Sequence, residues 1–293
     1  MDARAISLLV LLCALWGLQQ VAIKQAFAGG LSPFLQAGLR SALAALLVAV
    51  WIGLREGRGA LRRLLDPALA LWPGLVIAAI FAAEFLLLYP ALRLTTASRG
   101  VLFLYTAPFF TALGAHLFIP GERLRPRQAA GLAIAFLGVA LAFAQGLAEG
   151  GGSVLGDAMC VLAALGWAAN TITVRVSPGL RATPASGLLL YQLGGSAPVL
   201  LIAAGFVGDL GHFPNATAIA WAALFYQTVI VAFASYLVWF WLITVYPATV
   251  VSGFTFLTPV FGIFAGALLL GEPTAWPLFA GLGAIAIGMR LLR

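Results

Sequence analysis

The sequence predicts an all-α integral membrane protein with ten transmembrane helices, arranged as two five-helix repeats of inverted orientation. Apolar residues make up 63% of the chain and charged residues only 9%, against about 45–50% and about 25% in a soluble domain. Ten apolar runs of helix length follow one another along the chain, and several motifs of the first half return in the second. The composition therefore predicts a membrane protein, the length of the apolar runs predicts helices, and the repeated motifs predict two homologous halves.

The apolar runs are long enough to cross a membrane as helices. A spanning helix takes about 20 apolar residues, whereas the strands of a membrane barrel show alternation over about ten residues. Several runs begin with a proline in the first turn, where the missing N–H costs no hydrogen bond. The predicted helices cover residues 6–28, 33–54, 68–92, 98–119, 127–146, 155–176, 183–207, 217–243, 248–270 and 275–292.

The second half repeats the residue order of the first. A tryptophan followed eight residues later by a basic residue occurs as Trp16 with Lys24 and as Trp167 with Arg175. A second shared motif places a proline, a Gly-Glu pair and two glycines in the same order: Pro108, Gly121-Glu122, Gly131 and Gly138, then Pro259, Gly271-Glu272, Gly281 and Gly288. A period near half the chain length indicates duplication. We therefore predict a first repeat over residues 1–149 and a second over 150–293, within a single membrane domain.

Lysine and arginine predict the orientation. With the N-terminus in the cytoplasm, most of the 16 basic residues fall in cytoplasmic segments, as the positive-inside rule requires. The net charge of +7 is then explained by basic loops facing anionic lipid headgroups, and no basic domain suggests nucleic-acid binding. Both termini are expected on the cytoplasmic side.

Five helices in each half is an odd number, so the second half enters the membrane in the opposite orientation to the first. Inverted repeats are typical of secondary transporters, whose substrate site lies near the bilayer midplane. The sequence therefore predicts a transporter that works by alternating access.

These features resemble the EamA-type drug/metabolite transporter superfamily. The resemblance covers essentially the whole chain, although in the second half Ala168 stands where Gly17 follows Trp16, and Arg175 replaces lysine. It implies a basket of helices around a central cavity, with the first four helices of each repeat lining the cavity and the fifth packed outside. It also implies export of amino acids, other metabolites or toxic cations across the bacterial inner membrane. Within the family the chain looks most similar to the YddG-like amino-acid exporters.

Glu84 is the one acidic residue well inside a predicted helix. A carboxylate within the membrane is costly and indicates a functional site by default. Glu84 is therefore predicted to couple transport to a proton or cation, or to bind a substrate ammonium group. The alternative is a structural pair with Arg40, Arg93 or Arg99. The corresponding residue of the second half, Ser235, is not acidic.

Aromatic and amide side chains lie near the middle of several predicted helices. Trp16 and Trp167 are expected at matching depth, far from the interfacial belt where tryptophan is common. An indole face can hold a cation or an aromatic substrate, and amides at this level either join helices or meet a ligand. Core packing is the alternative for each. The predicted substrate-binding residues are Trp16, Gln19, Gln20, Glu84, Tyr105, Trp167, Asn170, Tyr226, Gln227, Tyr236 and Trp239.

Three prolines lie inside predicted helices rather than at their ends. Pro108 and Pro259 each remove the hydrogen bond to the carbonyl four residues back, and Pro90 lies near the outer end of its helix. A kink is the expected consequence, and a hinge for gating is the functional hypothesis. Thr106 and Thr258 are placed to satisfy the exposed carbonyls instead.

The other repeated residues have structural interpretations. Lys24 and Arg175 are expected to anchor helix ends by reaching toward the interface. Glu122 and Glu272 lie at turns between helices and are expected to act as caps, because helix N-termini favour carboxylates. Glycines seven residues apart put small residues on one helix face, for a seam that is either internal or a dimer contact: Gly131 and Gly138, Gly281 and Gly288.

Catalytic groups, metal sites and cofactors are not predicted. The chain has two histidines and no HExxH, GxSxG or P-loop motif, so an intramembrane enzyme is a weak rival. We expect an exporter of small metabolites, above all amino acids, including aromatic and apolar ones. The alternatives are an exporter of organic cations or other drugs, and an uncoupled facilitator or channel. Expected partners are the substrate and membrane lipids, and the chain is expected to be a monomer or homodimer.

Overall fold

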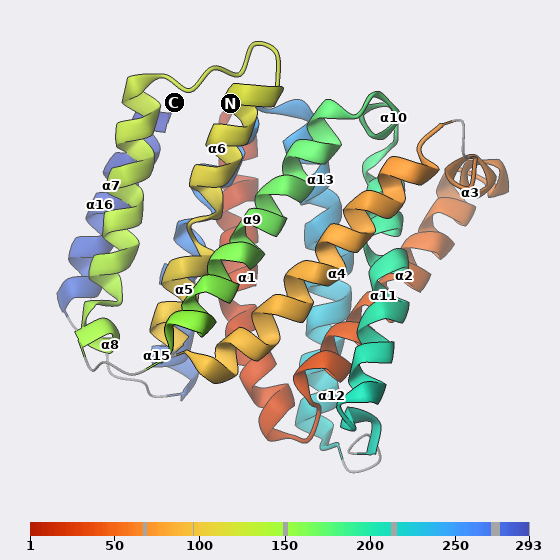
Figure 1. Cartoon of the computed structure of the whole chain (residues 1–293), viewed down its shortest axis with the longest axis horizontal. Helices are drawn as coiled ribbons and strands as arrows, with labels where there is room; N and C mark the ends of the chain where they lie inside the picture. The colour runs from red at the N-terminus through yellow and green to blue at the C-terminus, as the bar shows by residue number, and fades with distance from the viewer. Residues whose placement is uncertain (67–68, 96, 149–151, 212–215, 271–275, 293) are drawn as a thin grey trace. The chain divides into compact units, whose positions relative to one another are not determined.

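The structure is a computed structural model that describes the chain except residues 67–68, 96, 149–151, 212–215, 271–275 and 293. The described part consists of helices and their connections and contains no β-strand (Figure 1). Among the described residues, eight stretches are long and apolar enough to cross a membrane. Two further apolar helices, α7 (Pro126–Ala142) and α16 (Trp276–Leu292), are shorter. For the described residues, the prediction of an all-α chain with apolar helices of membrane-spanning length is confirmed.

The helices follow the predicted apolar runs. Within the described residues, six runs are single helices: α1 (Ala3–Ala28), α2 (Pro33–Arg55), α4 (Leu71–Leu94), α9 (Val154–Val176), α11 (Ala185–Phe206) and α16. Others consist of two or three pieces: α5 (Ala97–Leu104) with α6 (Ala107–Phe118), α7 with α8 (Ala144–Ala148), α12 (Ala218–Phe225) with the π-helical segment η2 (Tyr226–Ser235) and α13 (Tyr236–Val245), and α14 (Ala248–Phe254) with α15 (Leu257–Leu270). Two short helices in connections were not predicted, α3 (Arg58–Leu64) and α10 (Pro178–Arg181).

The breaks before α6 and α15 lie at corresponding places in the two halves. Residues 105–106 and 255–256 stand outside the helices, and Pro108 and Pro259 follow within the next few residues. Pro108 therefore lies in the first turn of α6, instead of inside a continuous helix as the sequence indicated. Beside the breaks, the hydroxyl groups of Thr106 and Thr255 donate to the carbonyls three residues back, at 2.6 and 2.7 Å. These bonds satisfy backbone groups that the interrupted helix leaves open.

The chain folds into two compact units, each built from segments of both halves. Unit 1 comprises residues 1–21, 87–172 and 245–293, and unit 2 comprises residues 22–86 and 173–244. Helices α1, α4, α9 and α13 each continue from one unit into the other.

In unit 1, α7 and α16 pack side by side through the repeated glycines (Figure 1). A Cβ atom on Gly138 would lie 2.7 Å from the carbonyl oxygen of Gly281, and one on Gly131 would lie 2.7 Å from that of Gly288. The helices run antiparallel, since Gln128 near the start of α7 donates to the Leu292 carbonyl at the end of α16. The glycine seam is therefore internal to the chain, which decides between the two alternatives that the spacing left open.

The end of α6 meets the start of α14 in the same unit. The Ala248 backbone N–H, at the first residue of α14, donates to Oε2 of Glu122 at 2.8 Å, and Ala115, Ile119 and Ala248 share a buried cluster. The expectation that Glu122 caps a helix is confirmed, with α14 as the helix that it caps. Glu272 lies outside the described residues.

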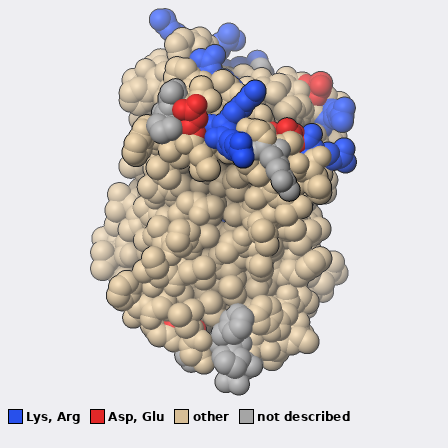
Figure 2. All heavy atoms as spheres, turned by 90° about the vertical axis from the view of Figure 1, so that its right-hand side faces the viewer, with Lys and Arg blue, Asp and Glu red and all other residues tan. Residues whose placement is uncertain are grey.

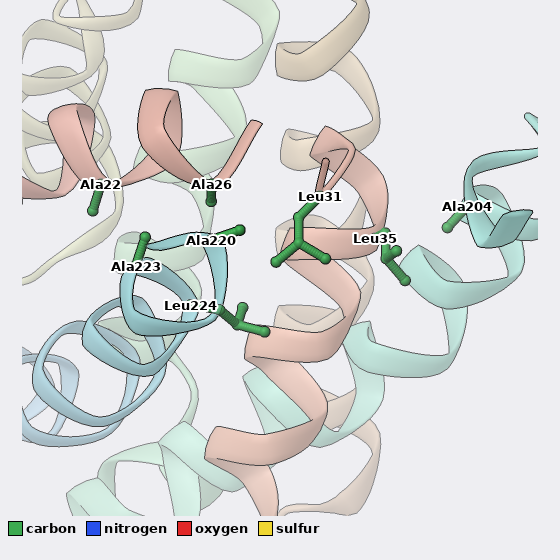
Figure 3. Packing of buried hydrophobic residues seen from close by; sticks show 8 residues of the cluster. All are labelled: Ala22, Ala26, Leu31, Leu35, Ala204, Ala220, Ala223 and Leu224. Carbon is green, nitrogen blue, oxygen red and sulfur yellow. The ribbon is translucent and has the colours of Figure 1, made fainter. Parts of the chain in front are cut away.

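In unit 2, α2 and α11 run antiparallel. At one end the Ser186 hydroxyl donates to Oε1 of Glu56 at 2.6 Å, and the Tyr191 hydroxyl donates to the Leu64 carbonyl. At the other end the start of α2 packs with the end of α11, the end of α1 and the start of α12 (Figure 3). The buried residues of this cluster are Ala22, Ala26, Leu31, Leu35, Ala204, Ala220, Ala223 and Leu224.

Charged residues gather at one end of unit 2. Arg55 ends α2, Arg62 and Arg63 belong to α3, and Arg181 ends α10. On the face shown in Figure 2, which is the side of α3 and α10, the basic side chains lie at one end and most of the remaining surface is uncharged. This distribution is the one that a bilayer selects, with charge in the headgroup region and apolar surface along the spans.

We predict that Gly281→Ala destabilises the protein, whereas Gly283→Ala on the same helix does not. The new Cβ of Gly281→Ala would overlap the Gly138 carbonyl and lie 3.0 Å from Ala142, and such overpacking costs about 1–3 kcal/mol. A Cβ on Gly283 meets nothing within 4 Å. Thermal unfolding in detergent measures both variants, and equal midpoints for the two would contradict the packing of α7 on α16.

Candidate functional site

Three aromatic side chains of the predicted set form a cluster in unit 1. The ring centroids of Trp16 on α1 and Trp167 on α9 are 6.4 Å apart at 66°, and those of Tyr105 and Trp167 are 6.0 Å apart at 74°. Both contacts are edge-to-face, the arrangement that aromatic quadrupoles favour. Tyr105 lies in the break between α5 and α6, so the interruption of that helix positions its ring.

Close helix packing holds Trp16 in place. Gly17 lies against α15, where a Cβ atom would come within 2.6 Å of Gly262 N and of Phe261 Cβ. The thiol of Cys13, one turn earlier, donates to the Phe254 carbonyl at 3.2 Å, next to the break before α15. The first part of α1 is thus fixed to the interrupted helix of the second half.

Two predicted amides belong to the same unit. Gln19 on α1 and Asn170 on α9 are both buried, and each lies three residues beyond the tryptophan of its own helix. The side chain of Gln20 lies outside the described part of the structure. Unit 1 therefore combines an aromatic cluster with buried amides on the same two helices.

Unit 2 contains a buried polar cluster between α2 and η2. Gln36 donates through Nε2 to the Leu31 carbonyl at 2.6 Å and accepts through Oε1 from Nε2 of Gln227 at 3.3 Å. Both amides are 1% exposed. Gln227 belongs to the π-helical segment η2. Such segments are rare and occur frequently at functional sites.

Arg40 is the central charge of this cluster, and the sequence had suggested it only as a partner for Glu84. The side chain is 1% exposed, and its guanidinium carbon lies 4.8 Å from the ring centroid of Phe85 on α4. Arg40 also interacts electrostatically with Glu84 and hydrogen-bonds Tyr236. Its position inside the apolar run 33–54 was the signal available in the sequence.

Glu84 lies beside this cluster and is partly exposed. Of the three arginines expected as its partners, Arg40 interacts with it. Arg99 instead pairs with Asp157 in unit 1, where the Thr95 hydroxyl donates to the same carboxylate at 2.6 Å. The side chain of Arg93 lies outside the described part of the structure.

The remaining predicted residues lie around these clusters. Tyr226, at the start of η2, packs against the cluster of Figure 3, and Trp239 is buried on α13. Pro90 lies inside α4. The predicted binding residues with described side chains thus divide between the units: Trp16, Gln19, Tyr105, Trp167 and Asn170 in unit 1, and Glu84, Tyr226, Gln227, Tyr236 and Trp239 in unit 2.

Arg175 has a structural task in unit 2. Its Nη1 donates to the carbonyls of Ile243 and Thr244 at 3.1 and 3.0 Å, in the last turn of α13. A cation at this place satisfies open carbonyls and complements the negative end of the helix dipole. Its partners are thus backbone carbonyls of a neighbouring helix.

The two clusters have different chemical capacities. The aromatic cluster offers indole and phenol faces for apolar groups or cations. The polar cluster offers a guanidinium, amides and a carboxylate for charged groups. Among the residues that the structure describes, no group of three or more His, Cys, Asp or Glu side chains is arranged to hold a metal ion.

This sequence and architecture have counterparts among known proteins. The model of the EamA-like transporter family matches residues 3–144 and again 154–293. An uncharacterized transporter of Archaeoglobus fulgidus is 27% identical, over 98% of this chain and 96% of its own length. A probable amino-acid metabolite efflux pump of Escherichia coli is 29% identical, over 96% of this chain and 92% of its own. One crystal structure shares the fold with a TM-score of 0.79 at 19% identity, over 99% of this chain and 96% of the other.

Proposed function

The chain belongs to the EamA-like transporter family, and from this premise we propose that it exports amino acids, including aromatic and apolar ones, by alternating access. The family consists of transporters rather than enzymes, and the chain is a multi-pass membrane protein with a small-molecule substrate. The observation that carries the proposal is the double family match, one in each half, together with relatives named probable amino-acid metabolite efflux pumps at 28–29% identity.

Helix contacts support ten transmembrane helices in two inverted repeats. Together with the eight long spans of the described residues, the shorter apolar helices α7 and α16 bring the number to ten. Each of the two has 17 residues and is about 26 Å long, close to the thickness of the hydrocarbon core, about 30 Å. Two pairs of corresponding helices run antiparallel within their units, α2 with α11 and α7 with α16, and the end of α6 meets the start of α14. Antiparallel counterparts are what inversion of a repeat produces.

The distribution of arginine supports an inner-membrane protein with both termini in the cytoplasm. Asp2 caps the start of α1 and hydrogen-bonds Tyr246, so the start of the chain lies near the start of α14. Partial burial and this carboxylate raise the pKa of Tyr246. Arg127 reaches the Arg290 carbonyl at the end of α16. The same end of unit 1 thus holds the start of α1, the end of α16 and the basic loop after α6, which the positive-inside rule assigns to the cytoplasm.

In this proposal the aromatic cluster of Trp16, Tyr105 and Trp167 in unit 1 is a binding surface for apolar or aromatic groups, with Gln19 and Asn170 as polar neighbours. Within unit 2, the polar cluster is a binding surface for charged groups, and Glu84 couples export to a proton or cation. The interrupted helices at Pro108 and Pro259, with Pro90 in α4, serve as hinges.

An exporter of organic cations is the second candidate. The edge-to-face cluster around Trp167 is the observation that favours it, because aromatic faces also attract cations.

Counterflow in proteoliposomes tests the proposal. We expect saturable uptake of labelled phenylalanine or leucine that depends on the same amino acid inside the vesicle. A channel would show conductance without counterflow. Saturable transport of organic cations with no transport of any amino acid would select the second candidate.

We predict that Glu84→Gln removes the pH dependence of export, because the neutral amide keeps the shape of the carboxyl group but binds no proton. Transport is measured over a pH series, with Asp66→Asn, an exposed carboxylate between α3 and α4, as the matched control. A Glu84→Gln profile that matches the wild type at every pH would exclude Glu84 from coupling.

A further inference from the structure

Buried polar atoms without partners gather on α2 and η2 in unit 2. Within the described part of the chain, Nε and Nη2 of Arg40, Oγ of Ser41 and Oγ1 of Thr228 are buried and have no hydrogen-bond partner. An unsatisfied buried donor or acceptor costs about 1–3 kcal/mol, and more if it is charged. Their concentration on two helices that pack together indicates a place prepared for a polar group that the chain itself does not supply.

The guanidinium of Arg40 lies over the Phe85 ring. Its carbon is 4.8 Å from the ring centroid, which is within the range of a cation–π contact. A guanidinium presents its N–H donors as a fixed fork that matches the two oxygens of a carboxylate. Tyr236 interacts with Arg40, and Nε and Nη2, which lie on one edge of the group, are the donors left without partners.

The neighbouring amides do not satisfy these donors of Arg40. Gln36 hydrogen-bonds the Leu31 carbonyl and Gln227, and Nε and Nη2 of Arg40 have no hydrogen-bond partner. Glu84 is the nearby carboxylate that interacts with Arg40, but it leaves Nε and Nη2 open. A buried arginine in a membrane protein marks a substrate or ion pathway.

We infer that Arg40 binds the carboxylate group of the transported substrate, through the Nε–Nη2 edge of its guanidinium. This inference rests on the proposed function and adds the substrate class: molecules with a free carboxylate, such as amino acids, in preference to the matching amines. Because the guanidinium is covered in this structure, the carboxylate reaches it in a state in which the packing over Arg40 has opened, as alternating access requires.

The test compares three probes of one shape: phenylalanine, phenethylamine and 3-phenylpropionate. In proteoliposomes, Arg40→Gln should reduce phenylalanine transport about tenfold to a hundredfold, the range expected for a hydrogen bond to a charged group. Transport of phenethylamine, where it occurs, should change less than about twofold. Arg55→Gln, which removes an exposed arginine from the same helix, is the matched control and should behave as the wild type. Unchanged phenylalanine transport by Arg40→Gln overturns the inference.

A second comparison separates binding of the substrate from neutralisation of Glu84. If Arg40 serves only that carboxylate, the double variant Arg40→Gln/Glu84→Gln should transport phenylalanine as well as Glu84→Gln alone, and this result overturns the inference. We expect the double variant to keep the loss seen in Arg40→Gln.

Thermal unfolding distinguishes failure of the inference from failure of the proposed function, because a ligand that binds the folded state raises the unfolding midpoint. We expect 3-phenylpropionate to raise the midpoint of the wild type and of Arg55→Gln but not that of Arg40→Gln. If this occurs and no amino acid is transported, the result supports the carboxylate site and contradicts the proposal of an amino-acid exporter. If amino acids are transported but 3-phenylpropionate raises the unfolding midpoints of the wild type and of Arg40→Gln equally, the result contradicts the carboxylate site and supports the amino-acid exporter.

Discussion

Hydrogen bonding inside an apolar solvent is the constraint on which the rest of this structure depends. A bilayer offers no water to a backbone or side-chain polar group, so each must find a partner within the protein. Where helices are interrupted or end, side chains provide that partner: Thr106 and Cys13 beside the two breaks, Glu122 at the start of α14, and Arg175 at the end of α13. Among the described residues, eight buried side-chain atoms lack a partner, and four of them belong to Arg40, Ser41 and Thr228 on α2 and η2.

Pairing of corresponding segments gives the two compact units their form. In each unit, segments of the first half pack against their counterparts from the second half, and the repeated glycines of α7 and α16 allow the closest of these contacts. The shared glycines of α7 and α16 lie at a helix–helix contact, and the prolines that both halves share lie at helix breaks. Glu84 has no acidic counterpart, because Ser235 stands at the corresponding position.

Much of the fold could be predicted because a helix that crosses the bilayer needs an apolar run of matching length, so the runs in the sequence mark the helices. The breaks at 105–106 and 255–256 were not predicted, since a proline inside an apolar run is compatible with a kink as well as with an interruption. The π-helical segment has no signature in residue type. From the sequence, Arg40 was predicted only as a possible partner for Glu84. Which of its N–H donors lack a partner depends on how α2 packs with α4 and η2, and the sequence does not show this. Division of the aromatic and polar residues between two units also depends on long-range packing.

Site-directed cysteine labelling tests the inversion most directly. In a protein whose native cysteines, Cys13 and Cys160, are replaced, single cysteines are introduced as Arg4→Cys near the start of α1 and Val154→Cys at the start of α9; both positions are exposed. A maleimide that does not cross the membrane should label Val154→Cys in intact cells with permeable outer membranes, and Arg4→Cys only after the inner membrane is opened. Labelling of both positions from the same side would contradict an inverted second half and the alternating-access mechanism that follows from it.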